Sequence, residues 1–278
     1  MSTATPLSDY VLGSSNTEHE RLIRQARTLA PLTERLFRDA GVSTGNRVLD
    51  VGSGVGDVAF LAAALVGPAG SVLGVDRDSV SLARARARAA TEHATTVRFV
   101  ETDVATLGGL RHEGEFDAIV GRFILMFLPD PAATVRALAA HLRPGGIIVF
   151  QEPSWASFFP QARHLPLRTA CGELVCEVLR RAGARANMEL TLYRGMIASR
   201  LTSPQLRVEV PIASDVDGRR WIHDLLVTLR PRIEQYGIPS DGIGDFDTLA
   251  ARLEAELQAV DSYAPMVGLV GAWARRVR

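Results

Sequence analysis

The 278-residue sequence contains no lysine, so all 31 of its basic side chains are arginines. Without lysine the chain can form neither a Schiff base nor the Walker A loop that binds nucleotide phosphates. The arginines are balanced by 31 aspartates and glutamates, which gives a formal net charge of zero. Proteins that bind nucleic acids usually carry an excess of basic residues, so the composition disfavours RNA and DNA as substrates. Nucleic-acid binding would then require a local basic patch on the surface.

The sequence is also poor in cysteine and in long apolar runs. Its two cysteines, Cys171 and Cys176, lie in a stretch with helical spacing. Their separation matches no zinc motif and does not align two thiols for a disulfide bond, so we expect both in the core of a protein from the reducing cytosol, with no bound metal. Charged residues interrupt the apolar runs well short of a membrane span, and the first residues show no export signal. We therefore expect a cytoplasmic protein without a membrane partner.

Three glycines at alternate positions follow the apolar segment 48–51 and precede a predicted helix. Gly52 and Gly54 can adopt backbone angles closed to other residues and let a ligand approach the main chain, while the helix directs its free N–H groups into the same space. In the dinucleotide fingerprint G-x-G-x-x-G the third glycine comes one residue later than Gly56. Asp50, two residues before the first glycine, suits a ligand with a cationic amine better than one with phosphates.

Carboxylates also end the next two predicted strands. Asp76 closes the segment 71–76, about 20 residues after the glycines, where doubly wound nucleotide sites place the acid that accepts hydrogen bonds from a ribose. Asp103 comes shortly after the strand 97–100. Open α/β sheets bind ligands at the carboxyl ends of their strands, so we predict that both carboxylates contact a ligand.

Strand and helix signals alternate through the first half of the chain. Such alternation predicts right-handed crossovers and a parallel sheet. After Pro153 the pattern becomes mostly helical, and Asp57 and Asp78 are predicted as helix N-caps. The expected strands are 48–51, 71–76, 97–100, 116–120, 147–150, 206–210 and 266–277, and the expected helices are one or two within 17–40, interrupted at Pro31, then 57–66, 79–92, 131–142, 165–184, 188–201, 219–236 and 246–262.

The acid before G-x-G-x-G, together with strands in this order, resembles the class I S-adenosylmethionine-dependent methyltransferases, and specifically their bacterial small-molecule branch. The resemblance is close over roughly residues 10–152 and only architectural beyond them. It implies a doubly wound, mostly parallel, seven-stranded Rossmann-like sheet with helical lid insertions. On this basis we expect a helical cap at 1–45, a cofactor-binding core at 46–152, and lid segments with the closing strands of the same sheet at 153–278.

The resemblance also implies a set of contacts to S-adenosylmethionine. The N-terminal pattern would fold over the methionine end of the cofactor, Asp76 would bind the ribose, and the residues after the third strand would read the adenine. Arg122 departs from the small polar residue often found at its position, so it could instead bind a carboxylate of the substrate. The expected contacts are Tyr10, Gln25, Asp50, Gly52, Ser53, Gly54, Gly56, Asp76, Arg77, Asp103, Val104, Gly121 and Arg122.

Methyl transfer needs a nucleophile held close to the methyl carbon, and orientation supplies much of the acceleration. A base is needed only when the acceptor must lose a proton, as a hydroxyl does and a carboxylate does not. The candidates are Glu152, His164 and His223, although a lone histidine is more often a surface or core residue. We expect methyl transfer to an oxygen or nitrogen of a small molecule. The alternatives are a protein that keeps the cofactor as a scaffold for a cyclisation or another reaction without methyl transfer, a nicotinamide oxidoreductase, and a non-catalytic binding module.

Overall fold

The computed structural model describes residues 13, 15–110, 112–213 and 215–277. The chain forms two compact units. The sheet unit consists of Ala26–Ser154, Asn187–Glu209 and Leu269–Arg278, and the helical unit of Met1–Gln25, Trp155–Ala186 and Val210–Gly268. This division falls within the first helix, so it cuts across the expected N-terminal segment.

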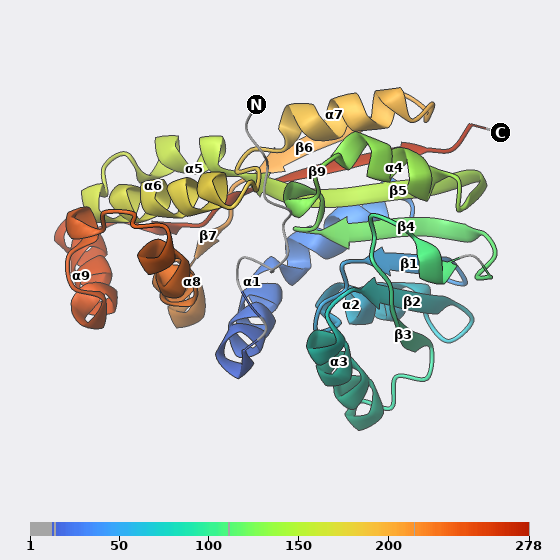
Figure 1. Ribbon diagram of the computed structural model, residues 1–278, viewed down its shortest axis with the longest axis horizontal. Coiled ribbons are helices and arrows are strands. Elements are labelled where there is room, and N and C mark those ends of the chain that lie inside the picture. Colours follow the sequence, from blue (N-terminus) through green and yellow to red (C-terminus); the bar gives the residue numbers. More distant parts are fainter. Residues whose placement is uncertain (1–12, 14, 111, 214, 278) are drawn as a thin grey trace. The chain divides into compact units, whose positions relative to one another are not determined.

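The sheet unit is built on seven strands in the order β3-β2-β1-β4-β5-β9-β6 (Figure 1). The pairs β1–β2, β1–β4, β2–β3 and β4–β5 are parallel, and β6 is antiparallel to β9. The predicted doubly wound, mostly parallel seven-stranded sheet is therefore confirmed. The strands are β1 (Arg47–Val51), β2 (Ser71–Asp76), β3 (Val97–Glu101), β4 (Phe116–Arg122), β5 (Leu142–Ser154), β6 (Gln205–Glu209) and β9 (Gly268–Arg275).

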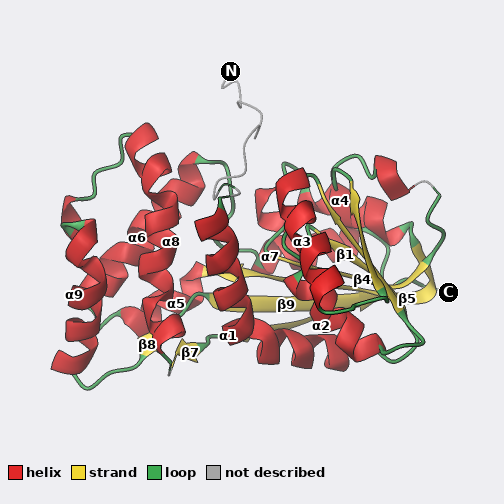
Figure 2. Cartoon of the chain, turned by 90° about the horizontal axis from the view of Figure 1, so that it is seen from below, coloured by secondary structure: helices red, strands yellow, loops and turns green. Residues whose placement is uncertain are grey.

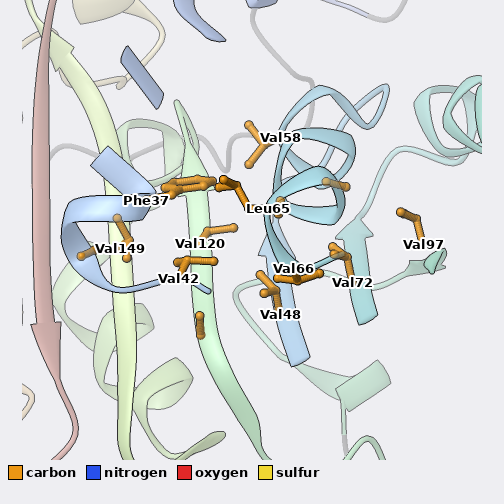
Figure 3. Close-up of a cluster of buried hydrophobic side chains, with 14 of the residues drawn as sticks. Phe37, Val42, Val48, Val58, Leu65, Val66, Val72, Val97, Val120 and Val149 are labelled. Carbon is orange, nitrogen blue, oxygen red and sulfur yellow. The ribbon is translucent and has the colours of Figure 1, made fainter. Parts of the chain in front are cut away.

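Side chains alternate between the two faces of this sheet, and both faces are buried. Val48, Val120 and Val149 belong to a core cluster that also contains side chains of the first three helices (Figure 3). The crossovers from β1 to β3 run in one direction along the sheet and those from β4 run in the other, which places helices on both faces. The helices of the sheet unit are the second part of α1 (Asn16–Ala40), α2 (Asp57–Val66), α3 (Ser79–Thr91), α4 (Pro131–Ala139) and α7 (Glu189–Ala198).

The first helix differs from the expectation, because α1 continues through Pro31 as one helix. Proline removes a backbone hydrogen bond from a helix interior. On both sides of Pro31, however, Leu29, Leu36 and Phe37 are buried at helical spacing. The free energy gained by burying this continuous apolar stripe outweighs the tendency of Pro31 to end the helix.

The two predicted N-caps have different outcomes. Asp78 caps α3, since its carboxylate accepts hydrogen bonds from the backbone amides of Val80 and Ser81. The prediction for Asp57 was wrong: Gly56 is the N-cap of α2, and Asp57 is the first helical residue. The Asp57 carboxylate instead pairs with Arg88 at 2.7 Å.

In the described residues, the helical unit contains the first part of α1, the helices α5, α6, α8 and α9, a short 3-10 helix (Asp241–Ile243) and a small two-stranded antiparallel sheet (Figure 2). The helix α5 was not predicted. It begins at Trp155, directly after β5, which ends at Ser154. Trp155, Phe158 and Trp221 are buried in this unit and pack against one another with Phe159. No helix in the described residues is long and apolar enough to cross a membrane. The elements are α5 (Trp155–Ala162), α6 (Pro166–Arg181), β7 (Ile212–Ala213), α8 (Val216–Gln235), α9 (Phe246–Ala259) and β8 (Ala264–Pro265).

Candidate active site

The glycine turn after β1 has the backbone that its sequence predicts. Gly52, Gly54 and Gly56 have φ angles of 69°, 51° and 93°, all in the left-handed region. A Cβ atom on Gly52 would lie 2.7 Å from Ile124 Cδ1, and one on Gly56 would lie 2.8 Å from the Phe60 ring. Next to Gly54 the space is open, with nothing within 4 Å of the same position. Packing within the protein therefore requires the outer two glycines, and a ligand can approach the main chain at Gly54.

Asp50 lies under this turn as a buried acceptor without a donor. Its side chain is 1% exposed, and neither carboxylate oxygen has a hydrogen-bond partner among the described residues. Burial raises the pKa of Asp50 well above its ordinary value, and the positive charge of Arg122 offsets part of this effect. The Ser53 and Thr102 hydroxyls are likewise buried and unpartnered. Unpaired buried acceptors are costly, so this edge of the sheet fits a ligand that brings donors, above all a cationic amine.

Asp76, at the end of β2, connects the glycine turn to the start of α3. Its Oδ2 accepts a hydrogen bond from the Gly54 amide and its Oδ1 one from the Asp78 amide, both at 2.9 Å. Burial raises the pKa of Asp76, although these two hydrogen bonds lower it. Each carboxylate oxygen can accept a further bond. Asp76 can therefore hold the turn and still accept hydrogen bonds from the hydroxyls of a ribose.

The residues predicted to contact the adenine lie beside this edge. Arg77 is exposed directly after Asp76. After β3, Asp103 is exposed and Val104 is 5% exposed. The Asp103 carboxylate accepts a 2.8 Å hydrogen bond from the Ala105 amide, which fixes its direction. Asp103 offers a polar group and Val104 an apolar surface, as a site for adenine requires. The contacts of Arg77, Asp103 and Val104 to adenine remain a prediction.

At the end of β4, Gly121 packs against the Phe150 ring, 2.8 Å from where a Cβ would lie. The next residue, Arg122, donates a hydrogen bond from Nη1 to the Thr33 hydroxyl at 3.0 Å. Thr33 in turn lies 2.7 Å from Gln151 Oε1. Burial lowers the pKa of Arg122, and the nearby charges of Asp57 and Asp50 oppose this effect. No sequence signal pointed to Thr33 or Gln151, which lie far from Arg122 along the chain.

Glu152 has a local partner for each of its oxygens. It is fully buried in β5. A short 3-10 helix, η2 (Leu125–Phe127), follows β4, and the Glu152 carboxylate accepts hydrogen bonds from backbone amides at the start of η2 and from that of Ile124, which precedes it. Oε1 binds the Ile124 and Leu125 amides at 3.0 and 2.9 Å, and Oε2 binds the Met126 amide at 3.2 Å. Burial raises the pKa of Glu152 to about 7, although the three amides lower it. The structure thus gives Glu152 a role in shaping this turn, and its role as a base remains a prediction.

Both candidate histidines belong to the helical unit. His164 is exposed, and its Nε2 lies 2.6 Å from the Ser262 hydroxyl. His223 lies on α8, and its Nδ1 is 2.9 Å from Asp224 Oδ1. The other oxygen of Asp224 accepts a 3.2 Å hydrogen bond from Arg24. Asp224 is the partner that sequence reasoning missed, although it directly follows His223 in the chain.

Asp224 is ionised in this environment. Burial raises its pKa, but the hydrogen bonds from His223 and Arg24 outweigh this effect, and the net pKa of Asp224 is lowered. A carboxylate can only accept, so the His223 nitrogen that faces it carries the proton. In the neutral ring Nε2 then holds the free lone pair, which is the arrangement of a general base.

The N-terminal cofactor candidates are only partly described. Tyr10 lies outside the described residues. Gln25, in the helical unit, accepts hydrogen bonds at Oε1 from Arg21 and from the Trp221 indole, at 2.7 and 2.9 Å. These bonds orient its amide nitrogen as a free donor. Among the described residues no three His, Cys, Asp or Glu side chains gather as metal ligands.

Comparison with known proteins identifies the family of this chain. Residues 43–190 match the model of a methyltransferase domain family. The aklanonic acid methyltransferase DauC of a Streptomyces species is 32% identical over 147 residues, which cover 52% of this chain and 65% of that protein. The chain thus matches about two thirds of the length of this relative.

Solved structures show the same fold at low identity. The phosphoethanolamine N-methyltransferase 2 of Haemonchus contortus, solved with S-adenosylhomocysteine, has a TM-score of 0.55 at 18% identity and covers 89% of this chain and 53% of that one. The [4+2]-cyclase SpnF has a TM-score of 0.55 at 19% identity and covers 89% of this chain and 80% of that one. The chain belongs to the class I S-adenosylmethionine-dependent methyltransferases, with S-adenosylmethionine as its cofactor.

Proposed function

We propose that this protein transfers the methyl group of S-adenosylmethionine to an oxygen or nitrogen of a small molecule of secondary metabolism, in the cytoplasm. The observation that carries the proposal is the pairing of His223 with an ionised Asp224 in the helical unit. A base with its proton-bearing nitrogen fixed is useful when the acceptor must lose a proton. The zero net charge speaks against a nucleic acid as the acceptor. A relative named for aklanonic acid supports an organic small molecule instead.

The cofactor supplies an electrophilic methyl group on a sulfonium. The chain's own residues bind and orient it: Asp50 faces the amine, Asp76 accepts hydrogen bonds from the ribose, and Asp103 reads the adenine. In the helical unit His223 takes the proton of the acceptor at Nε2, while Asp224 stabilises the resulting positive ring. His164 is the second candidate for this step, since its ring is exposed, with the Ser262 hydroxyl and the Tyr263 ring beside it. Bringing the reactants together without water supplies the remaining acceleration.

The second candidate function is a cyclisation that uses the cofactor only as a scaffold. The likeness to the cyclase SpnF keeps this candidate, although at 19% identity it shows only a shared fold. The two functions differ in their products. Methyl transfer releases S-adenosylhomocysteine and adds one methyl to the substrate, whereas a cyclisation leaves the cofactor intact.

The test is to incubate the protein with S-adenosylmethionine carrying a deuterated methyl group and with a panel of phenols, organic acids and amines. Mass spectrometry follows both the labelled product and S-adenosylhomocysteine. We expect labelled product from at least one acceptor, and a lower rate for His223→Ala than for His112→Ala, an exposed control histidine. An unlabelled product of unchanged mass, with no S-adenosylhomocysteine, would establish the cyclisation and refute methyl transfer.

A further inference from the structure

The strand β6 forms one edge of the seven-stranded sheet, and it carries exposed apolar side chains. Among the described strands β6 pairs only with β9, so backbone N–H and C=O groups along its other edge have no strand partner. Leu206 and Val208 on this strand are 36% and 47% exposed. An exposed edge strand with apolar side chains readily pairs with another chain. The strand β6 is therefore a candidate interaction surface.

The helix α7, which precedes β6 in the chain, has an exposed apolar stripe. Leu190, Tyr193 and Ile197 lie on one side of α7 and are between 45% and 56% exposed. The other side packs against α4, where a Cβ atom on Gly195 would lie 3.5 Å from Ala132 Cα. Because α4 connects β4 to β5 and α7 contacts β5, the stripe faces away from α4, toward the β6 edge of the sheet.

The stripe on α7 and the apolar residues of β6 lie on the same side of the sheet. Arg207 and Glu209 of β6 pair with Asp39 and Arg35 of α1, so these side chains point to the face that α1 covers. Side chains alternate along a strand, so the two apolar residues of β6 point to the opposite face. The core cluster beside α1 contains no described side chain of α4 or α7, which places both helices on that opposite face. We call the following residues the α7–β6 surface: Leu190, Tyr193, Ile197, Leu206 and Val208.

The charges of β6 are complementary to those of a second copy of the same strand. When two copies pair antiparallel with Val208 opposite itself on a twofold axis, Arg207 of each copy lies opposite Glu209 of the other. Opposite charges directly across an antiparallel pair stabilise it, and like charges destabilise it. The formal net charge of zero adds no long-range repulsion between two copies. The strand therefore fits its own copy better than a partner with charges of one sign.

We propose that the protein forms a twofold-symmetric homodimer through the α7–β6 surface, with the two β6 strands paired antiparallel about Val208. The sheet then continues from one copy into the other, and the free edge is removed. A five-residue strand is only about 17 Å long, so the stripe on α7 is needed to approach the roughly 800 Å² per partner that specific interfaces bury. A twofold contact closes at two copies. The inference does not depend on the proposed function.

Two variants with reversed charges test this pairing. Arg207→Glu places a carboxylate opposite Glu209 of the second copy, and Glu209→Arg places two guanidinium groups opposite each other. Each variant alone should be monomeric, whereas an equimolar mixture restores opposite charges at both positions and should form a heterodimer. Sedimentation equilibrium between roughly 0.1 and 100 µM measures the mass and the dimer Kd, and native mass spectrometry identifies the heterodimer by its mass. Circular dichroism and thermal melting show that each variant remains folded.

We expect the wild type to reach twice the monomer mass within this range. Arg207→Glu and Glu209→Arg should each raise the dimer Kd about 100-fold or more, because each creates two like-charged pairs. Val208→Lys should have a similar effect by placing two ammonium groups at the axis, and it leaves the ion pairs with α1 intact. Tyr193→Ala should raise the Kd about tenfold, since it removes an aromatic contact of α7. The control Val80→Lys, at a 55% exposed valine of α3, should match the wild type.

A wild type that stays monomeric at about 100 µM would overturn the inference and leave the α7–β6 surface to a different partner. A dimer that persists in both Arg207→Glu and Val208→Lys would also overturn it, since the copies would then associate through another surface. Two monomeric charge variants that form no heterodimer when mixed would overturn the pairing about Val208. Association beyond two copies would refute the closed twofold arrangement.

Discussion

Glu152 provides a test of how the turn after β4 is held. Its folded-state pKa is raised from an ordinary 4.5 to about 7 by burial, against the three amides that bind it. The unfolded chain therefore releases this proton at lower pH than the folded chain. The stability that protonation of Glu152 contributes is complete below about pH 4.5 and is lost as the pH rises through about 7. At about 1.4 kcal/mol per pKa unit the shift corresponds to about 3 kcal/mol.

Glu152→Gln removes this titration and keeps the shape of the side chain. The amide has one oxygen, so it can accept from Ile124 and Leu125 but presents a donor to the Met126 amide, and the variant carries a constant penalty from that mismatch. The difference in unfolding free energy between wild type and variant should therefore change by about 3 kcal/mol between about pH 4.5 and about pH 8, in favour of the wild type at the acid end. Urea unfolding at a series of pH values measures it.

The control is Glu92→Gln, whose carboxylate is 53% exposed at the end of α3. Its unfolding free energy should run parallel to that of the wild type over the same range. Parallel curves for Glu152→Gln as well would refute the reasoning, because they would show that the buried carboxylate does not change its protonation in this interval. Hydrogen exchange at the Ile124, Leu125 and Met126 amides gives an independent check of the same contacts.

Four further outcomes are expected. Calorimetry should show that the wild type binds S-adenosylhomocysteine but not NAD, and that Asp76→Ala weakens this binding by about 1.5–3 kcal/mol per hydrogen bond lost; tight NAD binding alone would contradict the cofactor assignment. Turnover should survive EDTA, and loss with recovery on adding magnesium would reveal a metal-dependent reaction. Asp224→Asn and His223→Ala should each slow single-turnover methylation of a hydroxyl acceptor about 10- to 100-fold, and rates equal to wild type would exclude the pair as the base. Gly54→Ala should fold but lose cofactor binding, whereas Gly52→Ala should lose thermal stability, because only the latter meets a side chain, that of Ile124; equal melting temperatures would contradict this difference.

The parts of the fold that could be predicted are those specified by neighbouring residues. The glycine turn, the N-cap Asp78 and the alternation of strands and helices depend on contacts within a few residues. The continuity of α1 through Pro31 depends on burial against the rest of the sheet unit, which no local rule contains. The length of β5 was missed for the same reason, since Gln151 and Glu152 are polar yet almost completely buried.

The site divides in the same way. Asp76 ends β2 and Asp50 is the last residue but one of β1, as the strand pattern and the spacing from the glycines predicted. Thr33 reaches Gln151 across 118 residues, and no spacing rule predicts such a bond. The bond between His223 and Asp224 was also missed, because adjacent residues of a helix normally point in different directions.

The turn after β4 packs against the glycine turn after β1, so Glu152, which holds the first turn, also affects the second. Its carboxylate fixes the amides of Ile124 and the two residues that follow, and this places the Ile124 side chain against Gly52. The first glycine of the motif is thus required by a neighbouring side chain, and the space that remains open lies at Gly54. A change at Glu152 should therefore alter cofactor binding through Ile124 and the glycine turn, even though the carboxylate itself faces the protein interior.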